Sequence, residues 1–204
     1  MTLLTWSIIV AMWASAVGSR TDAAVQATAP SSAHEAVALG RSRDAVLYDA
    51  FHAGYALTPS GDVESAEIIT EFRRAVMIVR RHADLGEYSF NENNLAREMG
   101  PYRGKVGFVV QIRLSPLHTY PAPPTYEMYL HTGPATKPVA LSGLKRDPVY
   151  PPGFFEPGTA FTSFRIEGSV ARDEIVTAVE PMLVVTNDRG DVIWQTRIDL
   201  ARFR

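Results

Sequence analysis

Apolar and polar side chains alternate most regularly between residues 105 and 114 of the chain. Every second position there is apolar: Val106, Phe108, Val110, Ile112 and Leu114. Because successive side chains of a β-strand point to opposite faces, this pattern predicts a strand with one buried face. It is the clearest strand signal in the sequence, and the predicted fold is built around it.

Shorter alternating runs follow, separated by segments rich in proline and glycine. We expect strands over residues 126–131, 139–144 and 160–168, a helical crossover over 171–179, and a hairpin of 182–186 with 192–200. The four prolines between residues 116 and 125 predict an extended loop or a sheet edge. Several short strands at this spacing are typical of an antiparallel β-sandwich, immunoglobulin-like or transthyretin-like in architecture.

The residues before the first clear strand favour helices. The best helix covers Glu64–His82, where Asp62 can cap the first turn and apolar residues recur every three or four positions. These apolar residues are Ile68, Ile69, Phe72, Val76 and Val79. A second helix over residues 93–99 ends at the Gly-Pro step that follows it. Residues 34–57 fit a short helix, which we favour, or a strand.

Together these elements predict an α+β fold. We expect one globular domain over residues 34–204, in which a mainly helical part at 34–100 packs on a β-sandwich at 105–204. One domain is also the usual size for a chain of 204 residues.

The N-terminal residues have the pattern of an export signal. No charged residue lies between Leu3 and Gly18, and the apolar run ends in an Ala-Ser-Ala step at Ala16. We therefore predict a signal peptide at 1–16, cleaved after Ala16 or Gly18, and a flexible spacer at 17–33. The alternative is an uncleaved N-terminal anchor, although 16 helical residues rise only about 24 Å. In both cases we expect the domain to be periplasmic or secreted.

Composition removes several classes of function. The chain has no cysteine, so it has no disulfides, thiolate metal sites or cysteine nucleophile. An exported chain without disulfides indicates a bacterial envelope. The formal net charge is only -2, which predicts neither nucleic acid nor an anionic membrane surface as a partner. Membrane contact is expected only through an uncleaved N-terminal segment, and no cofactor is expected.

The common catalytic motifs are missing or incomplete. His34 and Glu35 begin the His-Glu-x-x-His pattern of zinc proteases, but Ala38 stands where the second histidine belongs. Ser142 and Lys145 match Ser-x-x-Lys without its companion motifs, and a turn is the plainer interpretation. No Gly-x-Ser-x-Gly, phosphate loop or Gly-x-Gly-x-x-Gly is present.

Two groups of residues remain as candidate sites. His118, Glu127 and His131 could hold a transition metal, if the proline-rich loop brings His118 to the strand that carries the other two. Alternatively, they are solvated side chains at strand ends. Tyr120, Tyr126 and Tyr129 flank prolines that stiffen the backbone, and exposed tyrosines of this kind can stack on a sugar or on an apolar patch. The alternative is that Tyr126 packs in the core.

A further possibility is an arginine pair on the best helix. Arg73 and Arg80 lie seven residues apart, so both come to one helix face and could bind a carboxylate or phosphate. Ion pairs with Glu67 and Glu71 are the simpler interpretation. Taken together, these residues predict an exported, non-enzymatic binding or assembly module with an envelope protein or glycan as partner. The alternative is a secreted hydrolase that depends on a metal.

Overall fold

The predicted central strand is present and lies in the middle of a five-stranded sheet. This is a computed structural model, and it describes residues 30–115, 124–133, 137–151 and 161–203. Strand β3 (Lys105–Arg113) is flanked by β2 (Val63–Ile69) and β7 (Ser163–Ala171), and the short β1 (Ala56–Leu57) and β6 (Ser142–Val149) form the edges. All neighbouring strands in this sheet are antiparallel.

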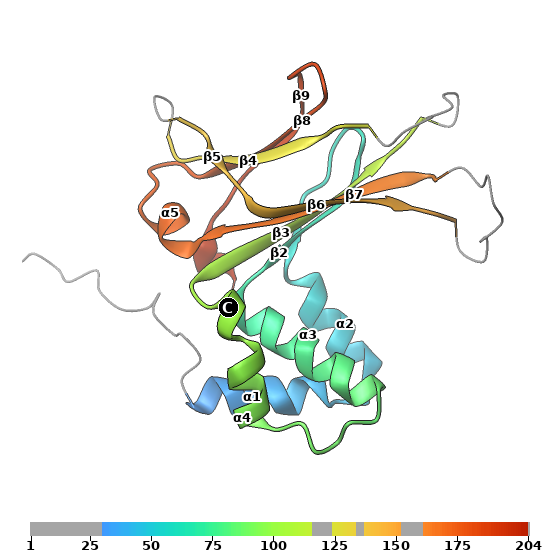
Figure 1. The fold of residues 1–204 in the computed structure, drawn as a ribbon, viewed down its shortest axis with the longest axis vertical. Coiled ribbons are helices and arrows are strands. Elements are labelled where there is room, and N and C mark those ends of the chain that lie inside the picture. The colour runs from blue at the N-terminus through green and yellow to red at the C-terminus, as the bar shows by residue number, and fades with distance from the viewer. Residues whose placement is uncertain (1–29, 116–123, 134–136, 152–160, 204) are drawn as a thin grey trace, which may run out of the picture.

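A second antiparallel sheet lies on one face of the first (Figure 1). Its four strands follow the order β5 (Val139–Ala140), β4 (Glu127–His131), β8 (Met182–Thr186) and β9 (Val192–Arg197). Only Leu141 separates β5 in one sheet from β6 in the other, so the chain passes between the sheets there. The predicted hairpin is therefore confirmed as β8 and β9, and the predicted strand at 139–144 is divided between the two sheets.

The two sheets share one hydrophobic core. Phe108, Phe164 and Ile166 enter it from the five-stranded sheet, and Leu130 and Leu183 enter it from the four-stranded sheet. Each of these side chains is at most 1% exposed. The fold class α+β, with two antiparallel sheets, is thus as predicted.

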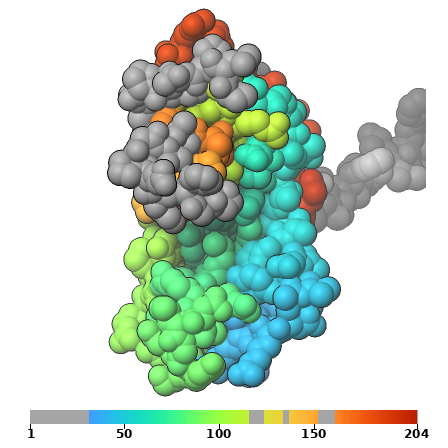
Figure 2. All heavy atoms as spheres, turned by 90° about the vertical axis from the view of Figure 1, so that its right-hand side faces the viewer, coloured from blue at the N-terminus to red at the C-terminus, as the bar shows by residue number. Residues whose placement is uncertain are grey.

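The helices form a separate layer on the other face of the five-stranded sheet (Figure 1). It contains α1 (Pro30–Gly40), α2 (Ala45–Ala53), α3 (Glu71–Asp84), α4 (Glu92–Glu98) and the 3-10 turn η1 (Gly100–Tyr102). Figure 2 shows this layer, in blue and green, as the lower part of the molecule. Two short elements lie elsewhere, α5 (Arg172–Val176) within the predicted crossover and η2 (Leu200–Arg202) near the C-terminus.

A second core holds the helical layer together. Val76 and Val79 of α3 pack with Ala36 of α1 and Leu95 of α4. At Gly40 the two longest helices come so close that an added Cβ would lie 2.6 Å from the Cβ of Val79. Glycine therefore permits the close crossing of α1 and α3.

The predicted long helix is wrong in its first part. Residues Val63–Ile69 form strand β2, and the helix begins only at Glu71. Thr70, not Asp62, is the N-cap, because its hydroxyl oxygen accepts a hydrogen bond from the Arg73 amide. The pairing of β2 with β3 shifts between Val63 and Ser65. This bulge disturbs the alternation by which the strand would have been recognised.

Other boundaries also differ from expectation. Helix α1 begins at Pro30, inside the predicted spacer, since proline suits the first turn of a helix. The favoured helix within 34–57 is present as α2, and the helix expected at 93–99 is α4. The predicted signal peptide at 1–16 lies outside the described residues, as do His118 and Tyr120. In the described part of the chain, no helix has the length and apolar character needed to cross a membrane.

Candidate binding site

An aromatic hollow of about 230 Å³ opens where the helices meet the C-terminal end of the chain. It is lined by Glu35, Leu39, Phe51, Gly54, Tyr55, Phe72, Arg202 and Phe203. These residues come from α1, from α2 and the two residues that follow it, from α3, and from the segment around η2. Apolar cavities of about 150 Å³ hold benzene, so the volume suits one ring or branched apolar side chain.

The wall of the aromatic hollow is formed by aromatic rings that contact one another. Phe51 meets Tyr55 and Phe72 edge-on, with ring centroids 5.1 and 5.8 Å away. Tyr55 is stacked with Phe203 at 6.0 Å. Aromatic pairs attract one another in these arrangements, so the rings hold Phe203, close to the C-terminus, against the wall.

Arg73 supports this wall from behind. Its side chain is 4% exposed, and its Nη1 donates to the Ile68 carbonyl oxygen at 2.7 Å. Its Nε donates to His52 Nδ1 at 3.0 Å, its Nη2 pairs with Glu67, and its guanidinium lies 5.2 Å from the Tyr55 ring centroid. A buried charge is tolerated only when it is paired and hydrogen-bonded. Arg73 meets that condition and fixes the position of Tyr55.

The same contacts determine the protonation of His52. Arginine has no acceptor, so His52 Nδ1 must be the acceptor and the ring is neutral, with its proton on Nε2. Burial lowers the pKa of His52, and the charge of Arg73 lowers that pKa further. His52 Nε2 is buried and has no hydrogen-bond partner among the described residues. The wall of the aromatic hollow is therefore held by a neutral histidine.

Apolar surface continues from the aromatic hollow along α2. Leu47, Phe51 and Gly54 follow one another at helical spacing, and the last two line the hollow. Leu47 is 51% exposed and Val46 is 79% exposed, and no side chain of α2 is fully buried. A nine-residue helix of this kind presents an apolar surface to solvent.

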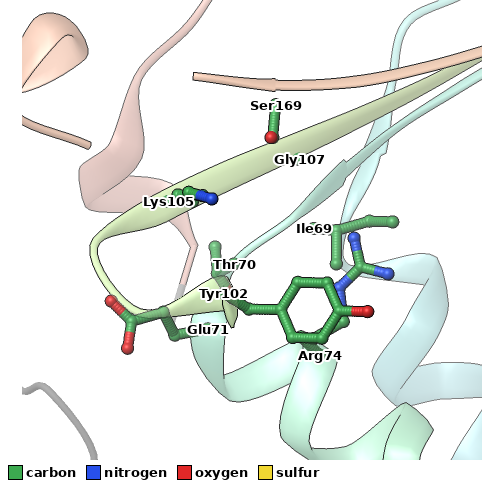
Figure 3. A pocket seen from close by; sticks show the side chains of 8 residues that line it. All are labelled: Ile69, Thr70, Glu71, Arg74, Tyr102, Lys105, Gly107 and Ser169. Carbon is green, nitrogen blue, oxygen red and sulfur yellow. The ribbon is translucent and has the colours of Figure 1, made fainter. Parts of the chain in front are cut away.

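A second, polar hollow is much smaller and lies where α3 and η1 meet the inner strands β2, β3 and β7 of the five-stranded sheet (Figure 3). It is lined by Ile69, Thr70, Glu71, Arg74, Tyr102, Lys105, Gly107 and Ser169. Its volume of about 10 Å³ holds one water molecule at most. We call it the polar notch.

Arg74 and Glu71, two of the charged residues around the polar notch, contact neighbouring groups. Arg74 lies 4.8 Å from the Tyr102 ring centroid and 3.6 Å from a Glu167 carboxylate oxygen. Glu71 Oε1 accepts a hydrogen bond from the Gly104 amide at 2.8 Å, whereas its Oε2 is buried without a partner among the described residues. In Figure 3 the Glu71 carboxylate points away from the Arg74 guanidinium. The polar notch thus joins α3 to the sheet and has no room for a ligand.

Tyr126 and Tyr129, the two candidate tyrosines among the described residues, lie against the core of the two sheets. The Tyr126 ring centroid is 5.9 Å from that of Phe164, and Tyr129 is half-buried with its ring 5.3 Å from the His131 ring. Both tyrosines pack against the shared core. The structure therefore does not bring these two rings together on one exposed platform.

Glu127 and His131, the two candidate metal residues among the described residues, have other neighbours in the structure. Glu127 accepts a hydrogen bond from Arg146 Nη2 at 2.6 Å, and His131 contacts Tyr129. Within the described residues, no group of three His, Cys, Asp or Glu side chains could hold a metal ion. Ser142, of the Ser-x-x-Lys match, shares hydrogen bonds with Ser169 across the strands.

The two arginines expected on one helix face have different roles. Arg73 is buried behind the aromatic hollow, and Arg80 pairs with Asp84 at 2.9 Å and reaches the Ser42 carbonyl oxygen at 2.8 Å. The expected ion pair with Glu67 is present, although Glu67 lies on β2 and not on the helix. Neither arginine is arranged to bind an anion from solution.

The aromatic hollow was not found from the sequence, because four separate segments build it. Phe51 and Tyr55 were visible only as apolar residues of a short helix, and Phe203 lies far from them in the chain. The one available signal was the mainly apolar sequence of α2, in which Asp49 and His52 are the strongly polar residues. No family model, curated protein or solved structure matches the chain.

Proposed function

We propose that this protein is an exported, non-enzymatic binding module, and that the aromatic hollow receives an apolar side chain of a partner protein in the bacterial envelope. The observation that carries the proposal is the ring-lined hollow beside an exposed apolar helix. Binding pockets are typically apolar and aromatic with few polar groups, and large exposed apolar patches occur at interaction surfaces. The predicted export signal supports the envelope as the location.

The rim of the aromatic hollow suits a partner without strong net charge. Glu35 and Arg202 are both exposed and of opposite sign, and the guanidinium of Arg202 lies 5.4 Å from the Phe203 ring centroid. The two sheets are, in this proposal, a β-sandwich of the immunoglobulin-like or transthyretin-like kind that carries the helical layer. The shared core of the sheets supports that assignment.

The first test asks whether the aromatic hollow accepts apolar groups. Indole, phenol and leucine amide are titrated into the isotope-labelled full chain, and amide NMR shifts are followed. Burying one such side chain contributes about 1.5 to 3 kcal/mol, so we expect millimolar binding or weaker, with shifts around Gly54, Tyr55 and Phe203. Equal, small shifts spread over the whole surface would contradict the proposal.

The second test uses a panel of envelope proteins and glycans. Phe203→Ala removes one wall of the aromatic hollow, and we expect the affinity of a bound partner to fall about 10- to 100-fold, as for a central interface residue. Tyr150→Ala is the matched control, because Tyr150 is an exposed aromatic residue outside the hollow. Binding to no member of the panel would contradict the proposal, as would equal loss in both variants. A stoichiometric metal in protein purified without chelator would instead favour the hydrolase.

A further inference from the structure

His82, at the C-terminal end of α3, lies between two carboxylates. Its Nδ1 is 2.6 Å from a Glu87 carboxylate oxygen and its Nε2 is 2.8 Å from a Glu98 carboxylate oxygen. The side chain is only 16% exposed. Glu87 comes from the loop between α3 and α4, and Glu98 comes from α4. The ring therefore connects three parts of the helical layer.

Both contacts can be hydrogen bonds only if the ring carries two protons. An ionised carboxylate accepts and does not donate, and a neutral imidazole has a single N–H. In the neutral ring, the second nitrogen would present its lone pair to a carboxylate. Burial lowers the pKa of His82, but the hydrogen bonds to Glu87 and Glu98 outweigh it, so that the pKa lies above its usual value of 6.5.

The charged groups around His82 come from every element packed there. Arg81 of the same helix pairs with Glu98, and Arg41, which directly follows α1, donates to the Tyr88 carbonyl oxygen at 2.8 Å. Phe90, 8% exposed, stacks on the His82 ring with centroids 3.8 Å apart. Each arginine remains charged across the range in which histidine titrates, so only the ring changes its charge there.

We infer that His82, Glu87 and Glu98 form a pH-sensitive latch that holds residues 85–91 closed over the second core. The protonated ring donates to both carboxylates and keeps the loop in place. Loss of the proton removes one hydrogen bond and leaves a carboxylate facing a lone pair, so the loop is released. This inference is independent of the aromatic hollow and goes beyond the proposed function.

Release of the loop would change the surface of this part of the molecule. Leu85 and Tyr88 are already 68% and 67% exposed while the latch is closed. Opening would separate Phe90 from the His82 ring, so that the Phe90 side chain would become exposed beside Leu85 and Tyr88. The latch thereby controls how much apolar surface this part of the helical layer presents.

Hydrogen exchange of the full chain tests the latch. The Glu87 amide donates to the His82 carbonyl oxygen at 2.9 Å, and the Phe90 amide donates to the Glu87 carbonyl oxygen at 3.1 Å. Their protection factors, corrected for intrinsic exchange, should fall as pH rises above 6.5. The total fall is tenfold for each unit that separates the pKa values of the closed and open states. The Asn187 amide, bonded to Asp191 in another turn, is the internal reference.

Substitutions test whether the latch causes the pH dependence of these protection factors. His82→Gln should remove the pH dependence of these two amides. His34→Gln should leave it unchanged, because His34 has one contact with Glu92, at 3.1 Å, and is exposed. Protection that is constant with pH in the unsubstituted protein would overturn the latch, as would an unchanged profile in His82→Gln. If that variant does not fold, an NMR titration of the unsubstituted protein decides: a pKa of His82 at or below 6.5 would overturn it.

Discussion

Two histidines of the helical layer have partners that favour opposite protonation states. His52 receives a hydrogen bond from Arg73, which requires the neutral ring, whereas His82 lies between the carboxylates of Glu87 and Glu98, which favour the charged ring. Neither ring is fully exposed. Burial lowers the pKa of both rings, and the partners decide the net direction: the charge of Arg73 lowers the pKa of His52 further, whereas Glu87 and Glu98 raise the pKa of His82.

This difference divides the helical layer into a region whose organising charge is fixed near neutral pH and a region whose central charge changes with pH. Around His52 an arginine, which does not titrate, organises the wall of the aromatic hollow. Around His82 the central group is itself titratable near neutral pH. We therefore expect the aromatic hollow to keep its shape across the pH range in which residues 85–91 are released.

The largest expected effect comes from removing the centre of the fixed region. Arg73→Met should lower the free energy of unfolding by about 3 to 5 kcal/mol, because it leaves buried polar groups unpaired. Arg74→Met is the control and should cost about 1 kcal/mol or less, since its ion pair with Glu167 is long and partly exposed. Denaturant titration measures both. Equal losses would mean that the two arginines are equivalent and that the Arg73 network has no special role.

A second change tests the close crossing of α1 and α3, which lies between the two regions. Gly40→Ala places a methyl group 2.6 Å from the Val79 Cβ, and we expect a loss of about 1 to 3 kcal/mol. Leu39 on one side of Gly40 lines the aromatic hollow, and Arg41 on the other contacts the loop that carries Glu87. Gly100→Ala, with open space around its new methyl group, is the matched control. A stability equal to that of the control would show that the helices do not cross as closely as described.

Stability should depend on pH with opposite signs at the two rings. The folded-state pKa of His52 is lowered, so its contribution is present above 6.5 and is lost as pH falls through that lowered pKa. The folded-state pKa of His82 is raised, so its contribution is present below 6.5 and is lost as pH rises through that raised pKa. Each slope is at most about 1.4 kcal/mol per pH unit.

Single substitutions separate the two slopes. His52→Gln, whose amide oxygen can still accept from Arg73, should flatten the curve only below 6.5. His82→Gln should flatten it only above 6.5. Free energies of unfolding measured by denaturant titration across this pH range give the result. If His52→Gln flattened the curve above pH 6.5, or His82→Gln flattened it below pH 6.5, the assignment of the two slopes to these histidines would be wrong.

The smallest effect on stability is expected at the exposed surface beside the aromatic hollow. Leu47→Ser should change the free energy of unfolding by less than about 0.5 kcal/mol, because Leu47 is half-exposed. The same variant should weaken partner binding if the apolar surface of α2 belongs to the site. Val176→Ser, at a similarly exposed position outside the hollow, is the control for binding. Loss of stability with unchanged binding would exclude Leu47 from the interaction surface.

The strands were more predictable from the sequence than the helices and the site. Alternation identifies β3 directly, because Phe108, Val110 and Ile112 are each fully buried on one face. It fails at β2, where the register shift after Val63 interrupts the pattern. A bulge depends on the neighbouring strand, and no single segment contains that information.

The candidate sites depended on contacts between distant segments, which the sequence could not supply. Glu127 faces Arg146 across 19 positions of the chain, and Arg73 reaches back to His52 across 21. The local order of charges predicted ion pairs on α3, but it could not show that one arginine is buried behind an aromatic wall. Long-range packing decides such roles.

The most direct test is a nitrogen-detected NMR titration of the two imidazole rings in the unsubstituted protein. At pH 6.5, the usual histidine pKa, we expect His52 to be mainly neutral with its proton on Nε2. At the same pH we expect His82 to be mainly charged, with protons on both nitrogens. A mainly charged His52, or a mainly neutral His82 at that pH, would contradict the distinction between a fixed aromatic hollow and a pH-sensitive latch.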